Sequence, residues 1–343
     1  MPLTHEISRD LARHGECSAR ARMHPSFPDV LNPQSLHRWL RKTALAAVPI
    51  LGLTGCDDCT ETSNYTREGY LPADAGWVVG SVHSSAECSR YCPSSQVCWH
   101  YDWDRCTVAG DGRLMCTGTE VFCGPRPCGR LPAGLRRASI ALATPVATEL
   151  AAAAHLEGAA VFAFRSLERE LLAHRAPLQL VRRAHSAQQD EKRHYVSMSH
   201  LAHRHGARVP TVDVDPAPVR TLLELAQENA IEGCVRETYG AAVAAFQGEW
   251  AAEPVVRRVM RSIAVDEAEH ASLGWAVDAW ARTRLSRAQR VLVDDQRAHA
   301  LNELGQQIKR PVTSEVMSIL GIPGTTQAAA LSRALAPLWE QWA

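Results

Sequence analysis

The chain has 343 residues, and its 37 basic and 37 acidic side chains give a formal net charge of zero. A balanced charge argues against a general nucleic-acid or acidic-membrane binder, because both usually show a basic excess. Apolar residues make up 46% and charged residues 22%, which is typical of a globular protein and excludes wholesale disorder. No uninterrupted apolar run reaches the roughly 18 residues that span a bilayer.

Residues 1–55 are predicted to be a leader that ends in a lipoprotein signal. A basic flank precedes an apolar stretch, 43–53, of about the length of a secretory h-region. The following Leu53-Thr54-Gly55-Cys56 resembles a bacterial lipobox, in which the cysteine is acylated. This resemblance implies export across the inner membrane and anchoring in the lipid of the cell envelope through Cys56. The alternative is a short buried helix or strand that ends in a glycine turn.

Residues 56–135 are predicted to form a small disulfide-rich, irregular module. The segment is rich in Gly, Pro, Ser and Asp, which favour loops. An even number of cysteines fits disulfides in an oxidising compartment, and the pairing stays open among 105 possibilities. A metal module is the alternative, but only Cys56 and Cys59 have CxxC spacing. The eight cysteines are Cys59, Cys88, Cys92, Cys98, Cys106, Cys116, Cys123 and Cys128.

The next domain, residues 138–283, is predicted to be all-α. Ala, Leu, Glu, Arg and Gln dominate it, and its breakers divide it into four helices of similar length. Similar long helices with tight first and third connections predict two helical hairpins and hence a four-helix bundle. Residues 284–343 are predicted to add accessory helices that pack on this bundle. The four expected helices are 144–174, 178–205, 217–249 and 254–283.

The two hairpins resemble each other in sequence. His155-Leu-Glu157-Gly-Ala is repeated as Ala230-Ile-Glu232-Gly-Cys, at an offset of 75 residues. Asp190-Glu191-Lys-Arg-His194 is repeated as Asp266-Glu267-Ala-Glu-His270, at an offset of 76 residues. In an antiparallel hairpin this spacing brings each lone Glu level with the Glu-x-x-His of its partner helix. The repeat therefore predicts one symmetric site.

Each of these carboxylates lies on the apolar face of its predicted helix. Uncompensated carboxylates in a core would be strongly destabilising, whereas two cations would neutralise them. Carboxylate and imidazole ligands without thiolates favour iron, with manganese as the alternative. The predicted metal ligands are Glu157, Glu191, His194, Glu232, Glu267 and His270.

Two details of this site extend the prediction. Asp190 and Asp266 each precede a Glu-x-x-His and are expected to accept the remaining N–H of a ligand histidine. On the third helix, Glu228 and Glu237 lie close to Glu232 in the chain, and the repeat alignment favours Glu232.

The six ligands resemble the ligand set of the ferritin-like superfamily, which includes rubrerythrins, bacterioferritins and di-iron carboxylate oxygenases. The resemblance covers about residues 140–283. The segment from Glu232 to Thr238, together with the cysteine-rich front end, resembles ferritin-like lipoproteins of myxobacteria. The resemblance implies a ferritin-like bundle with two iron ions that activates O2 or peroxide, as an oxidase, ferroxidase or peroxidase.

Two other functions stay open. The first is a metal-holding lipoprotein without turnover, whose cysteine-rich module contacts an envelope protein of unknown identity. The second is a structural bundle without metal.

Overall fold

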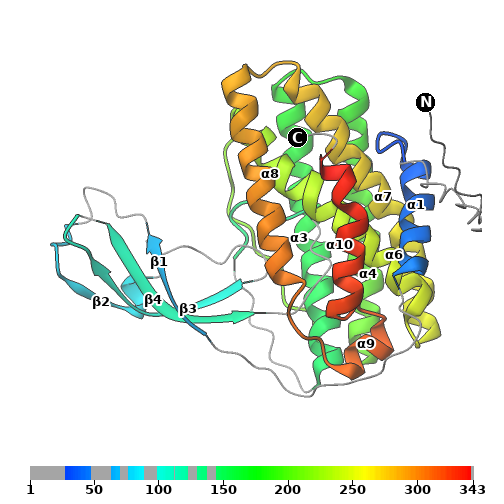
Figure 1. Cartoon of the computed structure of the whole chain (residues 1–343), viewed down its shortest axis with the longest axis horizontal. Coiled ribbons are helices and arrows are strands. Elements are labelled where there is room, and N and C mark those ends of the chain that lie inside the picture. Colours follow the sequence, from blue (N-terminus) through cyan, green and yellow to red (C-terminus); the bar gives the residue numbers. More distant parts are fainter. Residues whose placement is uncertain are drawn as a thin grey trace, which may run out of the picture.

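The structure is a computed structural model that describes residues 28–47, 63–69, 76–88, 99–111, 113–122, 130–136 and 144–340. The chain is mostly helical, and a small antiparallel sheet extends from one side of the helices (Figure 1). The predicted lipobox and the lipid-bearing Cys56 lie outside the described residues.

The sheet corrects the prediction of an irregular module. Its strand order is β1-β4-β3-β2, and all neighbouring strands are antiparallel. The sequence of β3 alternates aromatic and polar residues from Trp99 to Asp104, and this period of two is the signal of a strand. The module's many Gly, Pro and Ser residues obscured that signal. The strands are β1 (Ser63–Gly69), β2 (Val82–Ser84), β3 (Trp99–Val108) and β4 (Leu114–Phe122).

One disulfide is described in this module. It joins Cys88, in the short helix α2 (Ser85–Cys88), to Cys106 in β3, with 5.6 Å between the Cα atoms. Both cysteines are buried with Val108 and Leu114, so the disulfide lies in the module's small core. Cys116 is disulfide-bonded as well. The remaining cysteines of the front end lie outside the described residues.

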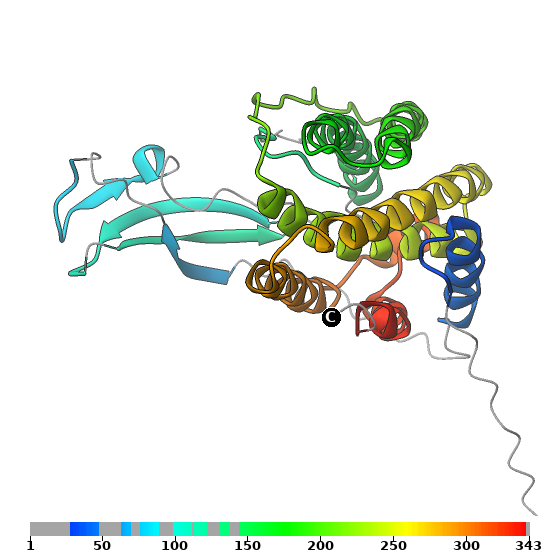
Figure 2. The same cartoon turned by 90° about the horizontal axis from the view of Figure 1, so that it is seen from above.

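Four long helical segments carry the candidate site. In Figure 2 the pair α3–α4 lies beside the pair α6–α7, and α4 contacts α7. Helix α3 begins after the N-cap Thr144, and α7 begins with Pro254 at its first turn. The bounds agree with the predicted helices to within a few residues. They are α3 (Pro145–Ala173), α4 (Leu178–Arg204), α5 (Leu222–Asn229) continued by the π-helix η1 (Ala230–Glu237) and α6 (Thr238–Trp250), and α7 (Pro254–Arg282).

The C-terminal region packs on these helices. Helices α8 (Arg287–Gln307) and α10 (Thr325–Glu340) lie in the region 284–343 that was expected to add accessory helices, and α9 (Ser314–Leu320) lies between them. Leu331, Leu335 and Leu338 of α10 are completely buried in the main core, which α10 therefore helps to form.

Helix α1 (Pro33–Ala46) belongs to the same core. Leu36, Leu40 and Ala44 are completely buried, and α1 packs on α6 and α7. Asn32 caps the helix, and Arg41 forms an ion pair with Glu249 at 2.7 Å. The predicted apolar leader stretch begins inside this helix. Residues 48–53 of that stretch lie outside the described residues.

Helix α3 is the one helix of the described chain that is long and apolar enough to cross a membrane. Its most apolar window is 67% buried inside the protein. The helix also carries Glu157 in the candidate site. Both features are those of a core helix.

Candidate metal centre

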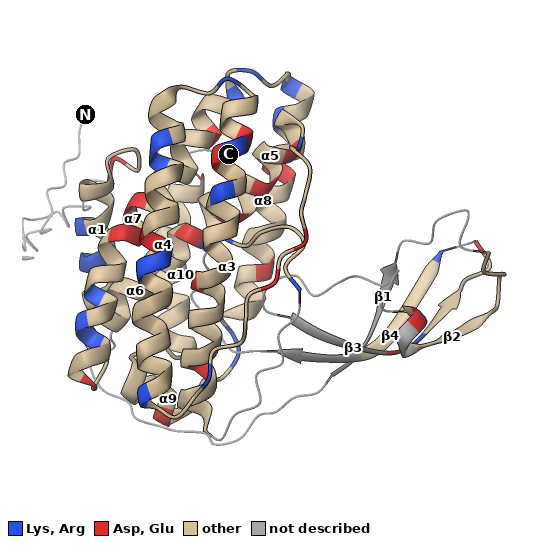
Figure 3. Cartoon of the chain, turned by 180° about the vertical axis from the view of Figure 1, so that it is seen from behind, with Lys and Arg blue, Asp and Glu red and all other residues tan. Residues whose placement is uncertain are grey.

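Carboxylate and imidazole groups from α3, α4, α7 and η1 converge in the helical core. In Figure 3 the acidic residues of α4 and α7 lie at the same level, near the middle of the helices. They form two groups that share Glu267, and within each group the possible ligand atoms lie within 4.8 Å of one another. The first group is Glu157, Glu191, His194 and Glu267, and the second is Glu237, Glu267 and His270.

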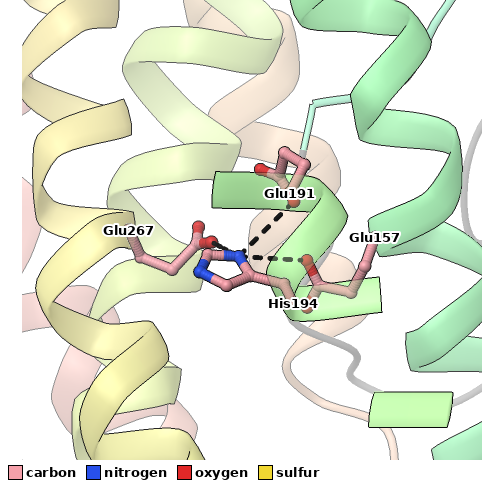
Figure 4. A group of neighbouring side chains, drawn as sticks. All are labelled: Glu157, Glu191, His194 and Glu267. Atoms are coloured by element: carbon pink, nitrogen blue, oxygen red, sulfur yellow. Dashed lines mark ion pairs between the residues drawn. The ribbon is translucent and has the colours of Figure 1, made fainter. Parts of the chain in front are cut away.

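His194 lies at the centre of the first group (Figure 4). Its Nδ1 atom is 3.6 Å from Glu157 Oε2, 3.5 Å from Glu191 Oε2 and 3.4 Å from Glu267 Oε1. His270 Nδ1 is 3.1 Å from Glu191 Oε1 and 3.5 Å from Glu267 Oε1. Glu191 thus turns one oxygen toward each histidine, and a single oxygen of Glu267 faces both. This is the arrangement that bridging carboxylates require.

The predicted aspartates hold the outer nitrogens of the two histidines. His194 Nε2 lies 3.1 Å from Asp266 Oδ2, and His270 Nε2 lies 3.4 Å from Asp190 Oδ2. Each aspartate therefore contacts the histidine of the other helix, because Asp266 of α7 faces α4 and Asp190 of α4 faces α7. The sequence does not reveal this cross-pairing. When Nε2–H donates to an aspartate, the Nδ1 lone pair faces inward, as a metal ligand requires.

Several inward-facing atoms form no hydrogen bond in the described structure, although the two histidine Nδ1 atoms lie 3.1 to 3.6 Å from carboxylate oxygens of the cluster. They are both oxygens of Glu191, Nδ1 of His194 and His270, and Oε2 of Glu237. Buried polar atoms almost always have a partner, so a convergent set without one requires a physical reason. Two ligand atoms at about 2.1 Å from a shared ion lie about 3 to 3.5 Å apart, as the atoms around each histidine do. The spacing of these ligand atoms therefore fits metal ions bound between them.

The electrostatics of the cluster support this fit. Burial raises the pKa of Glu157 to about 8, and burial together with the charge of Glu267 raises that of Glu237. Burial would lower the pKa of His194, but Asp266 and the cluster carboxylates outweigh it and raise that pKa. Cations therefore stabilise the charged carboxylates here, whether the cations are protons on the histidines or metal ions.

Glu232 is the one predicted ligand that the structure does not bring to the cluster. Its Oε1 atom accepts a short hydrogen bond from Arg236, and its Oε2 atom accepts one from the Leu131 N–H at 3.4 Å. The carboxylate of Glu237 lies in the cluster instead. The structure thus brings the neighbouring Glu237, rather than the predicted Glu232, to the cluster.

The π-helix explains why the repeat favoured Glu232. Five residues turn an α-helix by about 140° beyond a full turn, which would direct Glu237 away from the face of Glu232. With about 4.4 residues per turn, a π-helix reduces this difference to about 50°. A π segment inside an α-helix inserts a residue, so the regular period of an α-helix misplaces Glu237.

Glycines let the backbones of the site approach closely. A Cβ atom on Gly274 would lie 2.6 Å from the carbonyl carbon of Gly233, so η1 and α7 meet backbone to backbone. The Asn229 side chain donates to the Gly274 carbonyl oxygen at 2.9 Å across this contact. A Cβ on Gly158 would lie 2.9 Å from the Tyr195 ring between α3 and α4. The glycine that follows each repeated glutamate thus allows close packing against a neighbouring helix.

Two other motifs of the sequence lie apart from the centre. His205 pairs with Glu253 at 2.9 Å at the C-terminal end of α4. Cys234 is a buried free thiol, and burial raises its pKa, so it is protonated. Neither residue belongs to a metal-compatible group within the described part of the chain.

Comparison of the chain with protein-family models, curated proteins and solved structures gives no match. The function is therefore inferred from the residues of the chain and their geometry.

Proposed function

We propose that residues 144–282 form a ferritin-like four-helix bundle that binds two metal ions in this centre. The observation that carries the proposal is the convergence of Glu191, His194 and His270 in a buried site, where their inward-facing atoms lie 3.1 to 3.5 Å apart without forming a hydrogen bond. Glu157 and His194 would hold one ion, Glu237 and His270 the other, and Glu191 and Glu267 would contact both. This assignment retains five of the six predicted ligands and replaces Glu232 by Glu237.

Iron is the proposed metal, with manganese as the alternative, because the ligands are oxygen and imidazole nitrogen. Bound iron would supply redox chemistry toward O2 or peroxide. The chain's own residues orient the ligands, because the two aspartates fix the histidines. They also exclude bulk water, since Glu191 and His270 are 0% and 2% exposed. Such burial fits a small reactant and also fits a protein that holds metal without turnover.

Metal analysis tests the proposal directly. The wild-type protein is expected to bind two metal ions per chain, whereas Glu191→Ala and Glu267→Ala are expected to lose both, because each carboxylate faces both histidines. Binding is measured by elemental analysis after loading with iron(II) without oxygen, with circular dichroism to show that the variants are folded. A folded wild type that binds no metal would refute the proposal.

Oxygen exposure separates an oxidase, ferroxidase or peroxidase from a metal-holding protein. After anaerobic loading, an enzyme is expected to consume O2 or peroxide and to oxidise iron over repeated turnovers. A metal-holding protein is expected to keep its iron through repeated exposures with no catalytic consumption. An oxygen electrode and a ferrous-iron assay measure the difference.

The proposed location is the bacterial envelope, with a lipid anchor on Cys56. The lipobox and the disulfide between Cys88 and Cys106 support this proposal, because disulfides persist in oxidising compartments. Mass spectrometry of the mature chain tests it. Acylation at Cys56, abolished by Cys56→Ser, is expected, whereas an unprocessed chain that keeps α1 would contradict the lipoprotein assignment.

A further inference from the structure

The segment 130–136, here called the strap, reaches the metal centre from the direction of the sheet. Leu131 packs on Leu156 and Ala159 of α3, and Arg136 donates its N–H to the Asp213 carbonyl oxygen. Gly134 accepts a hydrogen bond from the Asp215 N–H at 2.9 Å. The strap is therefore fixed both to α3 and to the connection that precedes α5.

Two consecutive backbone N–H groups of the strap face carboxylates of η1. The Arg130 N–H donates to Glu237 Oε1 at 2.8 Å, and the Leu131 N–H donates to Glu232 Oε2 at 3.4 Å. The bond from Arg130 occupies one oxygen of Glu237, while the other oxygen is buried without a hydrogen-bond partner. The strap thus fixes the rotation of the Glu237 carboxylate.

The Arg130 side chain anchors the strap at this position. It is 1% exposed, and its Nε and Nη2 atoms donate to the two oxygens of Glu228 at 3.1 and 2.5 Å. Its Nη1 atom donates to Asn229 Oδ1 at 3.2 Å. A two-pronged guanidinium–carboxylate pair fixes direction as well as distance. Because Asn229 also holds Gly274 of α7, this anchor connects the strap to two helices of the centre.

We propose that Arg130 is a positioning residue of the metal centre, which holds Glu237 with one oxygen turned toward the ion bound by His270. This role depends on the proposed function, which it extends to a residue outside the helices. It also predicts an asymmetry. Glu237 belongs to the second group, whereas the carboxylates of the first group accept no hydrogen bond from the strap among the described contacts.

The test uses Arg130→Met in the full chain, titrated with Co2+ and followed by its visible absorption. Partners that orient a metal ligand typically contribute about 10- to 100-fold in affinity. One of the two Co2+ ions is therefore expected to bind at least about tenfold more weakly, with a changed absorption band, while the other binds as in the wild type. Arg297→Met is the matched control, because Arg297 is also buried, pairs with Asp278 at 2.9 Å and lies over an aromatic ring.

The control is expected to lose stability but to bind two ions with the wild-type spectrum. Glu228→Gln weakens the contact of Arg130 with residue 228 and changes no proposed metal ligand. If Arg130→Met does not fold, this second variant tests the role of Arg130. It is expected to weaken the same ion. Wild-type affinities and spectrum in the folded variants would overturn the role of Arg130, while two ions in the wild type would leave the proposed function intact. A metal-free wild type would overturn both.

Discussion

At the scale of single residues, Glu232 and Glu237 show how neighbouring side chains give two buried carboxylates of one helix different surroundings. Both carboxylates are buried, and burial raises the pKa of each. Arg236 lies within hydrogen-bond reach of Glu232, whereas the free oxygen of Glu237 lies in the carboxylate cluster. The charge of Glu232 is thus compensated by its own cation, whereas that of Glu237, which faces other carboxylates, is compensated only by a proton or a metal ion.

This difference predicts opposite effects of two matched substitutions. Glu237→Gln is expected to reduce the bound metal from two ions to one per chain, because the amide is a weaker ligand and removes the charge. Glu232→Gln is expected to keep both ions. Elemental analysis of the folded variants measures the stoichiometry. Loss of metal in Glu232→Gln alone would restore Glu232 as the ligand.

The stability of the metal-free protein is expected to depend on pH. The pKa of Glu157 is raised to about 8 in the folded state, so its stabilising contribution is lost as pH rises from about 4.5 to 8. The pKa of His194 is raised too, so its contribution is complete below about 6.5 and is also lost as pH rises. Both groups predict a Tm that falls from pH 6 to pH 9 in the presence of a chelator.

Metal-loaded protein is expected to show the opposite trend over this range, because metal binding requires deprotonated ligands. Thermal unfolding followed by circular dichroism compares the two forms. Glu157→Gln, which does not titrate, is the control and is expected to flatten the decline of the metal-free form. A metal-free Tm that is constant or rises with pH would contradict the prediction.

At the scale of elements, close backbone approach and helix type determine the geometry of the centre. The contact between Gly233 and Gly274 brings η1 against α7, and the π-helix turns Glu237 into the cluster. A helix that contains a π segment loses regular hydrogen bonding, and such segments are frequent at functional sites. The function of this centre therefore depends on two backbone features that carry no chemistry of their own.

Gly274→Ala is expected to destabilise the protein. The new methyl group would lie 2.6 to 2.7 Å from the Gly233 backbone, and overpacking of this kind typically destabilises a core by about 1 to 3 kcal/mol. Gly305→Ala in α8 is the control, because its methyl group meets open space and alanine favours a helix by about 1 kcal/mol. Urea unfolding should move in opposite directions for the two variants.

Removal of α1 tests its part in the core. A chain that begins at Cys56 lacks Leu36 and Leu40, and burial of a leucine side chain typically contributes about 1.5 to 3 kcal/mol. We expect a lower Tm than that of the full chain but unchanged metal stoichiometry, because all ligands lie between Glu157 and His270. Equal Tm values would show that α1 does not contribute to stability in solution.

At the scale of the whole molecule, the protein combines a helical part that carries the centre with a disulfide-bonded sheet. The strap follows the last strand in the chain, and its first residue, Arg130, donates its backbone N–H to the carboxylate of Glu237. Figure 1 shows the sheet beside the helices rather than around them.

Metal should stabilise the whole helical part. Ions that bind only the folded state at 100 times their Kd raise the free energy of unfolding by about 2.7 kcal/mol per site. We therefore expect a chelator to lower the Tm of the wild type and to leave that of Glu191→Ala unchanged. Differential scanning calorimetry measures both, and an equal response of the two proteins would contradict metal binding at this centre.

The four long helices and five residues of the cluster can be predicted from the sequence alone. Helix periodicity, caps and the spacing of Glu157, Glu191 and Glu267 are local quantities, and an antiparallel hairpin converts such spacing into proximity. The sequence also placed Asp190 and Asp266 near the histidines. The strands were missed although their alternation was present, because loop-forming residues dominated the composition.

Three features depend on how the helices pack. They are the histidine that each aspartate contacts, the glutamate of the third helix that lies in the cluster, and the contact of Arg130 with η1. The cross-pairing depends on how α4 and α7 face each other, which neither helix encodes alone. The choice of Glu237 depends on a π turn that packing stabilises against the intrinsic preference for an α-helix. The contact of Arg130 with Glu228 joins residues 98 apart in the chain, and no periodicity predicts such a contact.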